Sequence, residues 1–269
     1  MISPEERREI QRGSLEALKE LKRLCDKHGL RYYLVAGTLL GAVRHGGFIP
    51  WDDDVDVAMP RSDYKRLESL AKKELSPNFF YQTEKTDKHS PFFFAKLRKD
   101  GTSVTEFLFR GSKMHTGCYV DIFPLDRCPS REKRARRFFK LTSFFTCALI
   151  AKTSDNFVCE YTKKGALFAF SVMKKLPRCI LLFLRNAVRV YYTLTSSKKV
   201  ICTVAGSYGY PRETYPSEWF DERAELKFED EVFPVPKEYD KALTHMYGDY
   251  MTPPPENERN GHFIESNNE

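Results

Sequence analysis

The chain has 269 residues, 41% hydrophobic and 14% aromatic, so it can bury one substantial core and wholesale disorder is excluded. Its formal net charge of +7 is unevenly distributed, because residues 131–199 hold 16 Lys and Arg against 3 Asp and Glu. That segment carries +13 and the remainder −6, so the chain is an acidic body with a basic middle.

The seven cysteines are scattered, and no two form a CxxC pair. An odd, scattered set is typical of reduced thiols in the cytoplasm. The first residues are polar and charged, without the apolar core of a signal peptide. We therefore expect a cytoplasmic protein.

Along the chain, the first predicted helix begins at the capping box SPEE, residues 3–6, and ends at Gly29. The β-branched and aromatic segment RYYLVAGT predicts a strand that ends in a turn at Gly37 and Thr38. A short helix over residues 39–44, a strand at VDVAM and a helix over residues 62–75 follow.

Three further strands are predicted at FYQTE, FFFAKLRK and GCYVDIFPL, the last one bounded by Pro124. Helices that alternate with flanking strands favour an α+β fold, a mixed sheet covered by helices. Residues 131–199 change to a helical, basic and aromatic pattern. Short strands and a closing helix over residues 239–247 are expected after it.

This pattern divides the chain into four parts. We expect residues 1–130 to form the larger part of the core, and residues 131–200 to form a basic, amphipathic helical insertion. Residues 201–252 complete the core. The polar, Pro-rich residues 253–269 are expected to be loop or partly disordered.

The segment FIPWDDDVDVAMP, residues 48–60, concentrates four carboxylates in five positions. Because side chains alternate between the faces of a strand, Asp54 and Asp56 point the same way, Asp52 shares their parity, and Asp53 faces away. Oxygen ligands on one face suit a hard cation, Mg²⁺ or Mn²⁺, that keeps waters and substrate phosphates in its shell.

A further carboxylate, Asp121, lies in the apolar strand CYVDIFP, where burial would be costly unless the group is paired or metal-bound. Three convergent carboxylates on two strands predict a two-metal phosphoryl-transfer site, in which Asp54, Asp56 and Asp121 are catalytic. The expected metal ligands are Asp52, Asp54, Asp56 and Asp121. The backbone at Gly37 and Thr38 would offer N–H groups to a phosphate.

Other interpretations of the acidic segment are weaker. An EF-hand loop that starts at Asp52 would need Gly where Val57 stands, and it would contain Pro60. Glycosyltransferases with a D-x-D motif and haloacid-dehalogenase-type phosphatases also place such a motif at a strand end. An acidic surface turn before a strand is the simplest alternative.

Three basic residues are candidate phosphate ligands. Lys96 and Arg98 share one face of the FAKLRK strand, although a solvated strand edge lined with basic residues is as good an interpretation. Arg44 precedes a Gly-Gly pair and could reach a phosphate or brace Asp53.

Four segments, AGTLLGAVRHGGFIPWDDDVDVAM, FAKLRKDGT, GCYVDIFPLD and YGDYMTPPPENER, resemble in order the LicD phosphocholine-transferase family, which is related to the fukutin family. The resemblance covers about residues 30–126 and 215–259. It implies a nucleotidyltransferase-type fold and transfer of phosphocholine from CDP-choline to a hydroxyl of a cell-surface glycan or glycolipid precursor, with release of CMP.

Carried over residue by residue, the resemblance implies that Asp54 and Asp56 bind the metal ion and that Asp52 is the carboxylate before them. It implies that Asp121 is the third catalytic carboxylate and that Gly37 and Thr38 open the nucleotide site. Transfer of another CDP-activated alcohol phosphate, nucleotidyl transfer, and a membrane-associated binding protein of the same fold are the alternatives. A choline head would need aromatic faces, for which Trp51, Trp219 and Tyr215 are candidates.

In the basic middle, the longest uncharged apolar run, residues 141–151, is shorter than the roughly 20 residues that span a bilayer. Amphipathic segments rich in Lys, Arg, Phe and Leu suit a helix that lies on an anionic membrane, here the inner face of the cell membrane. A helical subdomain with a solvated basic side is the alternative. The long apolar runs disfavour a nucleic-acid partner.

Overall fold

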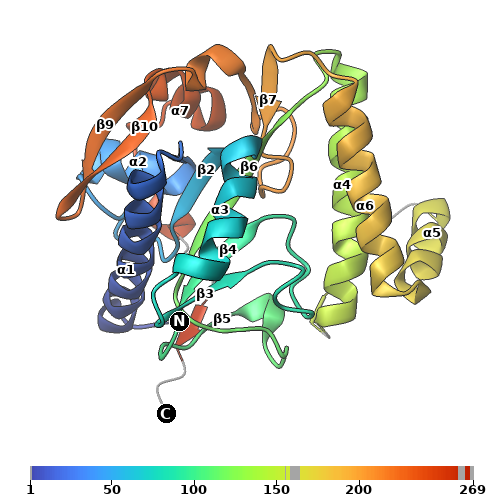
Figure 1. Ribbon diagram of the computed structural model, residues 1–269, viewed down its shortest axis with the longest axis horizontal. Coiled ribbons are helices and arrows are strands. Elements are labelled where there is room, and N and C mark those ends of the chain that lie inside the picture. Colours follow the sequence, from blue (N-terminus) through green and yellow to red (C-terminus); the bar gives the residue numbers. More distant parts are fainter. Residues whose placement is uncertain (1, 155, 158–163, 260–263, 267–269) are drawn as a thin grey trace.

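The computed structural model of the protein describes residues 2–154, 156–157, 164–259 and 264–266. A mixed sheet, in the order β1-β2-β6-β4-β3, forms the centre, and β7 and β8 extend it from the end of β6. The pair β2–β6 is parallel, and the other pairs of the sheet are antiparallel. Helices flank this sheet, so the predicted α+β fold is confirmed (Figure 1).

The N-terminal helix α1 (Pro4–His28) has the predicted start and end. Ser3 and Glu6 form the reciprocal capping box, and Gly29 adopts φ 61° at the C-terminal end. Leu18 and Leu21 are fully buried, and they share one core cluster with Leu67 of α3 (Arg61–Glu74) and with the strands. This layer of α1 and α3 against the sheet is the main hydrophobic core.

The predicted turn at Gly37 and Thr38 is wrong. The strand β1 (Tyr33–Leu34) is only two residues long, and α2 (Ala36–His45) begins directly after Val35. Ala36 takes the left-handed value φ 48°, so the chain bends one residue earlier than the glycine suggests. Gly37 and Thr38 therefore lie in the first turn of α2.

The central strands follow the prediction: β2 (Asp56–Pro60), β3 (Phe79–Gln82), β4 (Ala95–Lys99) and β6 (Tyr119–Arg127). One expected boundary is wrong, because β6 continues through Pro124. The ladder of β6 with β4 ends at Ile122 and its ladder with β7 begins at Asp126. Pro124 lies between them, where the strand can do without its N–H.

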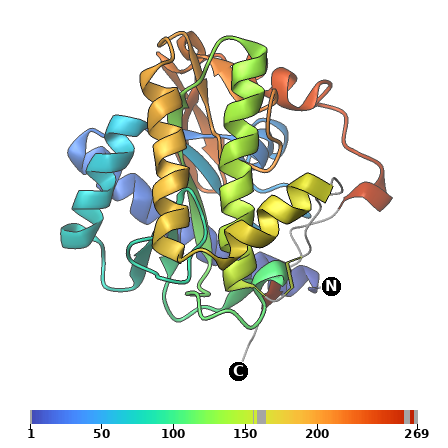
Figure 2. The ribbon, with the colours of Figure 1, turned by 90° about the vertical axis from the view of Figure 1, so that its right-hand side faces the viewer.

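The predicted helical insertion consists of α4 (Glu132–Thr153), α5 (Lys164–Lys175) and α6 (Arg178–Leu194). Helices α4 and α6 stand side by side at one flank of the sheet, as Figures 1 and 2 both show. No helix of the described residues is long and apolar enough to cross a membrane.

After the insertion the chain returns through β7 (Val200–Cys202) and β8 (Thr214–Pro216). A hairpin of β9 (Arg223–Phe228) and β10 (Glu231–Pro236) then adds Phe228, Phe233 and Val235 to the main core. Helix α7 (Tyr239–Tyr247) has the predicted bounds. Three short 3-10 helices complete the structure: Phe107–Phe109, Ser217–Phe220 and Glu256–Glu258.

The expectation that the tail lacks regular structure is wrong for β11 (Ile264–Ser266), which pairs with β5 (Val104–Glu106). Within the described residues β5 has no other strand partner, so its open edge accepts the tail. The six described cysteines carry free thiols. The seventh, Cys159, lies outside the described residues.

Candidate functional site

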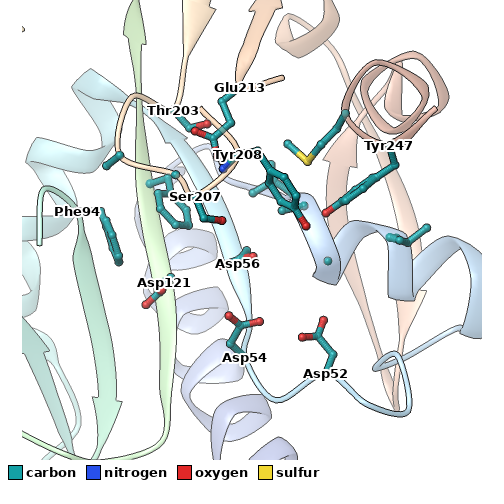
Figure 3. A pocket seen from close by; sticks show the side chains of 18 of the residues that line it. Asp52, Asp54, Asp56, Phe94, Asp121, Thr203, Ser207, Tyr208, Glu213 and Tyr247 are labelled. Atoms are coloured by element: carbon teal, nitrogen blue, oxygen red, sulfur yellow. Dashed lines mark hydrogen bonds between the residues drawn. The ribbon is translucent and has the colours of Figure 1, made fainter. Parts of the chain in front are cut away.

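A pocket of about 670 Å³ opens near the N-terminal ends of β2 and β6, where these strands carry Asp56 and Asp121. Helix α2, the loop between β7 and β8, helix α7 and helix α4 complete its walls. Its volume is within the range of about 300–1,000 Å³ that is usual for small-molecule sites. Asp52, Asp54, Asp56 and Asp121 all line it (Figure 3).

The parallel pairing of β2 and β6 brings the predicted carboxylates together, because Asp56 and Asp121 are direct register partners. Neighbouring strands lie about 4.8 Å apart, so these two side chains project from adjacent backbones. Asp54 and Asp52 come from the loop that leads into β2, and Figure 3 shows both carboxylates at the floor of the pocket. Asp53 is buried and does not line the pocket.

Contacts of the first turn of α2 hold this floor in place. The Thr38 hydroxyl accepts a hydrogen bond from the Asp56 backbone N–H at 2.8 Å, so Thr38 positions the strand instead of lining the pocket. A Cβ atom at Gly37 would lie 2.7 Å from Oδ2 of Asp52. The glycine is therefore what allows Asp52 to approach the helix, whose N-terminus remains the predicted phosphate site.

Asp121 is paired with the predicted phosphate ligand Lys96. Lys96 is buried, and its Nζ lies 2.9 Å from Oδ1 of Asp121 and 3.0 Å from Oε1 of Glu106, over the ring of Tyr119. Burial raises the pKa of Asp121 to about 7, and the Lys96 ammonium opposes this rise. Asp121 thus takes up and loses a proton near neutral pH.

Lys96 lines the pocket, whereas Arg98 does not. The Arg98 guanidinium donates to Oε1 of Gln82 at 2.7 Å and to the carbonyl of Gly117 at 2.8 Å. The alternative prediction, that these residues line a solvated strand edge, is also wrong. Strand β4 lies between β3 and β6, and the side chains of Lys96 and Arg98 are both buried. Arg98 lies on the same strand face as Lys96, as predicted, but its guanidinium is hydrogen-bonded to Gln82 and Gly117 and does not reach the pocket.

The third phosphate candidate, Arg44, lines the pocket near its rim. Its Nη1 donates to the carbonyl of Tyr250 at 3.1 Å, and its guanidinium lies 5.9 Å from the centroid of the Trp51 ring. Burial lowers the pKa of Arg44, and the nearby Arg259 lowers it further. Of these two arginines, only Arg44 lines the pocket.

Glu213, which the sequence analysis missed, is buried in the pocket wall. Its Oε1 accepts a hydrogen bond from the Tyr208 backbone N–H at 3.1 Å, and its Oε2 has no hydrogen-bond partner among the described residues. A Cβ at Gly206 would lie 1.8 Å from Oε1, so the loop closes tightly over the acid. Burial raises the pKa of Glu213 to about 8.

Through this contact Glu213 holds Ser207 and Tyr208 over the carboxylates (Figure 3). Tyr208 meets Tyr247 edge to face at a ring separation of 5.5 Å. Burial raises the pKa of Tyr208, and the negative charges of Asp52, Asp54 and Asp56 raise it further. The two glycines of the loop are the only sequence signal for this element, and they did not identify the acid.

Of the three aromatic residues predicted to contact a choline head, two line the pocket. Trp51 and Tyr215 line the pocket, but Trp219 does not and instead packs against Tyr215 and His245. Tyr208 and Tyr247 add further aromatic faces to the wall.

The carboxylates of the pocket fit a metal ion whose coordination shell is completed by water and substrate. They do not form a site in which the protein supplies all the ligands. Among the described residues no three His, Cys, Asp or Glu side chains converge closely enough to hold a metal ion by themselves. Mg²⁺ usually takes one or two carboxylates and leaves its other positions to water and phosphate oxygens. Asp54 and Asp56, which face an open pocket, meet that requirement.

Residues 29–136, which hold α2, β2, β4, β6 and all four carboxylates, match the family model described as LicD/FKTN/FKRP, nucleotidyltransferase domain. That match assigns the core to the nucleotidyltransferase class. The chain is also 31% identical over 269 residues to the lipopolysaccharide cholinephosphotransferase LicD of Haemophilus influenzae, and the alignment covers 96% of both chains. This protein belongs to the LicD family.

Two further relatives match over a shorter length. The ribitol 5-phosphate transferases FKRP of Homo sapiens and Mus musculus are each 45% identical over 60 residues, which is 21% of this chain and 12% of theirs. All three relatives are transferases by name.

Proposed function

We propose that this protein transfers phosphocholine from CDP-choline to a hydroxyl group of a cell-surface glycan or glycolipid precursor, as the name of its Haemophilus relative suggests. The observation that carries the proposal is the likeness over 96% of both chains to a lipopolysaccharide cholinephosphotransferase. The pocket supports it, because four carboxylates line one cavity of suitable size.

The transfer breaks the phosphoanhydride bond of CDP-choline and forms a phosphodiester with the acceptor. The acceptor oxygen attacks the phosphorus that bears choline, its bond to the CMP oxygen breaks, and the hydroxyl proton leaves to a base. Asp121 is our candidate base, because a pKa of about 7 lets it accept a proton at neutral pH. Lys96 keeps its carboxylate oriented and prevents a still higher pKa.

Asp54 and Asp56, with Asp52 beside them, would hold Mg²⁺ or Mn²⁺, which neutralises charge on a diphosphate when it is bound. Arg44 and the N–H groups of the first turn of α2 would receive phosphate oxygens, and Arg44 and Gly37 line the pocket. The aromatic side chains of Tyr208, Tyr215 and Tyr247 offer faces for a trimethylammonium group.

An incubation of the purified full chain with choline-labelled CDP-choline and a glycan extract tests the proposal. We expect equimolar CMP release and label incorporation, both lost in EDTA and restored by Mg²⁺. A parallel reaction with CDP-ribitol addresses the similarity to the ribitol 5-phosphate transferases. Incorporation from CDP-ribitol alone would assign another alcohol, and no CMP from either donor would leave only a binding protein.

A further inference from the structure

Large hydrophobic side chains are exposed mainly on the helical insertion. Of the eleven that are exposed among the described residues, eight belong to α5 and α6. Phe168 of α5 is 73% exposed, and Phe183 and Leu194 of α6 are 70% and 74% exposed. Single exposed apolar residues are ordinary, but a concentration on one pair of helices marks a contact surface.

Helix α6 is apolar on two sides. Its inner side carries Leu181 and Tyr192, which are buried in clusters with α4. Its outer side carries residues at helical spacing that form a second stripe, the residues Ile180, Phe183, Tyr191 and Leu194. Helix α6 already has its packing partner, so the outer stripe is not needed to hold the insertion together.

The charged residues of the segment that carries this stripe have a single sign. Residues 164–200 contain eight Lys and Arg and no Asp or Glu. Lys174 and Lys175 are exposed at the start of the α6 stripe, and Lys198 and Lys199 are exposed beyond its end. Apolar side chains framed by lysines complement a surface that is apolar inside and negative at its face, which describes an anionic lipid bilayer.

We propose that the outer faces of α5 and α6 dock this protein on an anionic lipid bilayer. Phe168, Phe183 and Leu194 enter the boundary between headgroups and acyl chains, while the lysines at both ends contact the headgroups. The stripe from Ile180 to Leu194 is about 21 Å long, so α6 lies along the surface.

A second copy of the chain suits this face less well. A two-fold interface would bring the same surface of two copies together, and the exposed lysines would face lysines, with no carboxylate from residues 164–200 of either copy. A bilayer offers the missing negative charge.

Docking would also place the pocket next to the membrane. Helix α4 packs against α6, and it also contributes Thr146 and Ile150 to the pocket wall. A substrate held in the lipid surface would then lie close to the carboxylates. The docking surface is independent of the identity of the donor nucleotide.

Vesicle flotation of the full chain tests the proposal with phosphatidylcholine vesicles and with vesicles that contain 30% phosphatidylglycerol. We expect binding to the second kind only, weakened as NaCl rises. Phe183→Ser and Leu194→Ser should each lower the partition coefficient about tenfold or more, because each removes a buried apolar side chain. Lys174→Glu/Lys175→Glu should lower it more than tenfold, since each lysine contributes about fivefold.

Matched controls lie elsewhere on the surface. Val232→Ser removes an exposed apolar side chain from β10, and Lys72→Glu/Lys73→Glu reverses an exposed lysine pair on α3. Both should bind vesicles like the parent protein. Equal binding to neutral vesicles, no binding to either kind, or full binding by Phe183→Ser/Leu194→Ser would overturn the proposal. So would a dimer that this double substitution dissociates.

Discussion

The core and the helical insertion differ in where they place charge and apolar surface. In the core, Asp121 and Lys96 are buried beside each other and further carboxylates gather at the pocket floor. In the insertion, Phe183 and Leu194 are exposed and lysines frame them.

Both arrangements cost folding free energy, because buried charge loses hydration and exposed apolar surface orders water. The comparison teaches that each region carries a feature its own stability does not require. A substrate phosphate and ion would compensate the first feature, and a lipid surface the second. The expected outcomes below separate the two, from the largest effect to the smallest.

Asp56→Asn should lower the rate of CMP release about 10³-fold, because it removes a carboxylate whose charge would organise the reacting diphosphate. The free energy of unfolding should stay equal or rise, since Asp56 adjoins Asp121 and like charges repel. Steady-state kinetics and urea denaturation measure both quantities. Asp230→Asn, at an exposed partner of Lys19, is the control that should keep full activity; near-parental turnover by Asp56→Asn would reject its role.

Arg185→Met should destabilise the protein by about 2 kcal/mol, because it leaves buried carbonyls and the partly exposed carboxylate of Glu84 without their partner. Arg185 is fully buried, forms an ion pair with Glu84, and donates to the carbonyl of Pro91 at 2.7 Å, so it fastens α6 to the loop before β4. The control Arg136→Met removes an exposed pair with Glu132 and should cost at most about 0.5 kcal/mol. Equal urea midpoints for the two variants would contradict this anchoring role.

Glu213→Gln should abolish part of the pH dependence of stability. The raised pKa of about 8 means that the folded protein keeps the Glu213 proton above the ordinary pKa of 4.5. The contribution of the protonated Glu213 side chain to the free energy of unfolding is therefore complete below pH 4.5 and is lost as the pH rises through about 8. The neutral variant should gain up to a few kcal/mol on the parent between pH 5 and pH 9, at about 1.4 kcal/mol per pKa unit. A constant difference in urea unfolding over that range would refute the buried neutral acid.

Lys96→Met should move the acidic limb of the kcat/KM profile to higher pH by about one unit. Loss of the ammonium removes the group that lowers the pKa of Asp121, so the unprotonated base forms later. The control Lys99→Met removes a lysine of the same strand that pairs with Glu16. That limb should stay in place for the control, and an unmoved limb in Lys96→Met would exclude Asp121 as the base.

The sequence predicted those parts of the molecule that depend on local rules. The capping box at the start of α1 and the bounds of α7 follow from residues close in the chain. These two features need no knowledge of distant partners. The meeting of Asp56 with Asp121 is a distant contact, and it could be expected because a carboxylate in an apolar strand is costly to bury unless it is paired or metal-bound.

The rest depended on contacts between distant segments. Ala36 bends the chain before Gly37, which local preference does not favour. Arg98 shares a strand face with Lys96, but Gln82 of the neighbouring strand engages it. Glu213 lies in a loop whose closure over the pocket depends on Tyr208 and on tertiary packing. No spacing in the sequence encodes these partners.

A double-mutant cycle tests most directly whether the two parallel strands build one reacting centre. The rates of CMP release by Asp56→Asn, Asp121→Asn and the double variant are compared with the parent under saturating Mg²⁺ and CDP-choline. Groups that act as a unit give strongly non-additive losses, so we predict that the double variant loses little more than the worse single variant. Losses that multiply would mean that the two carboxylates act independently, and that result would contradict a shared centre.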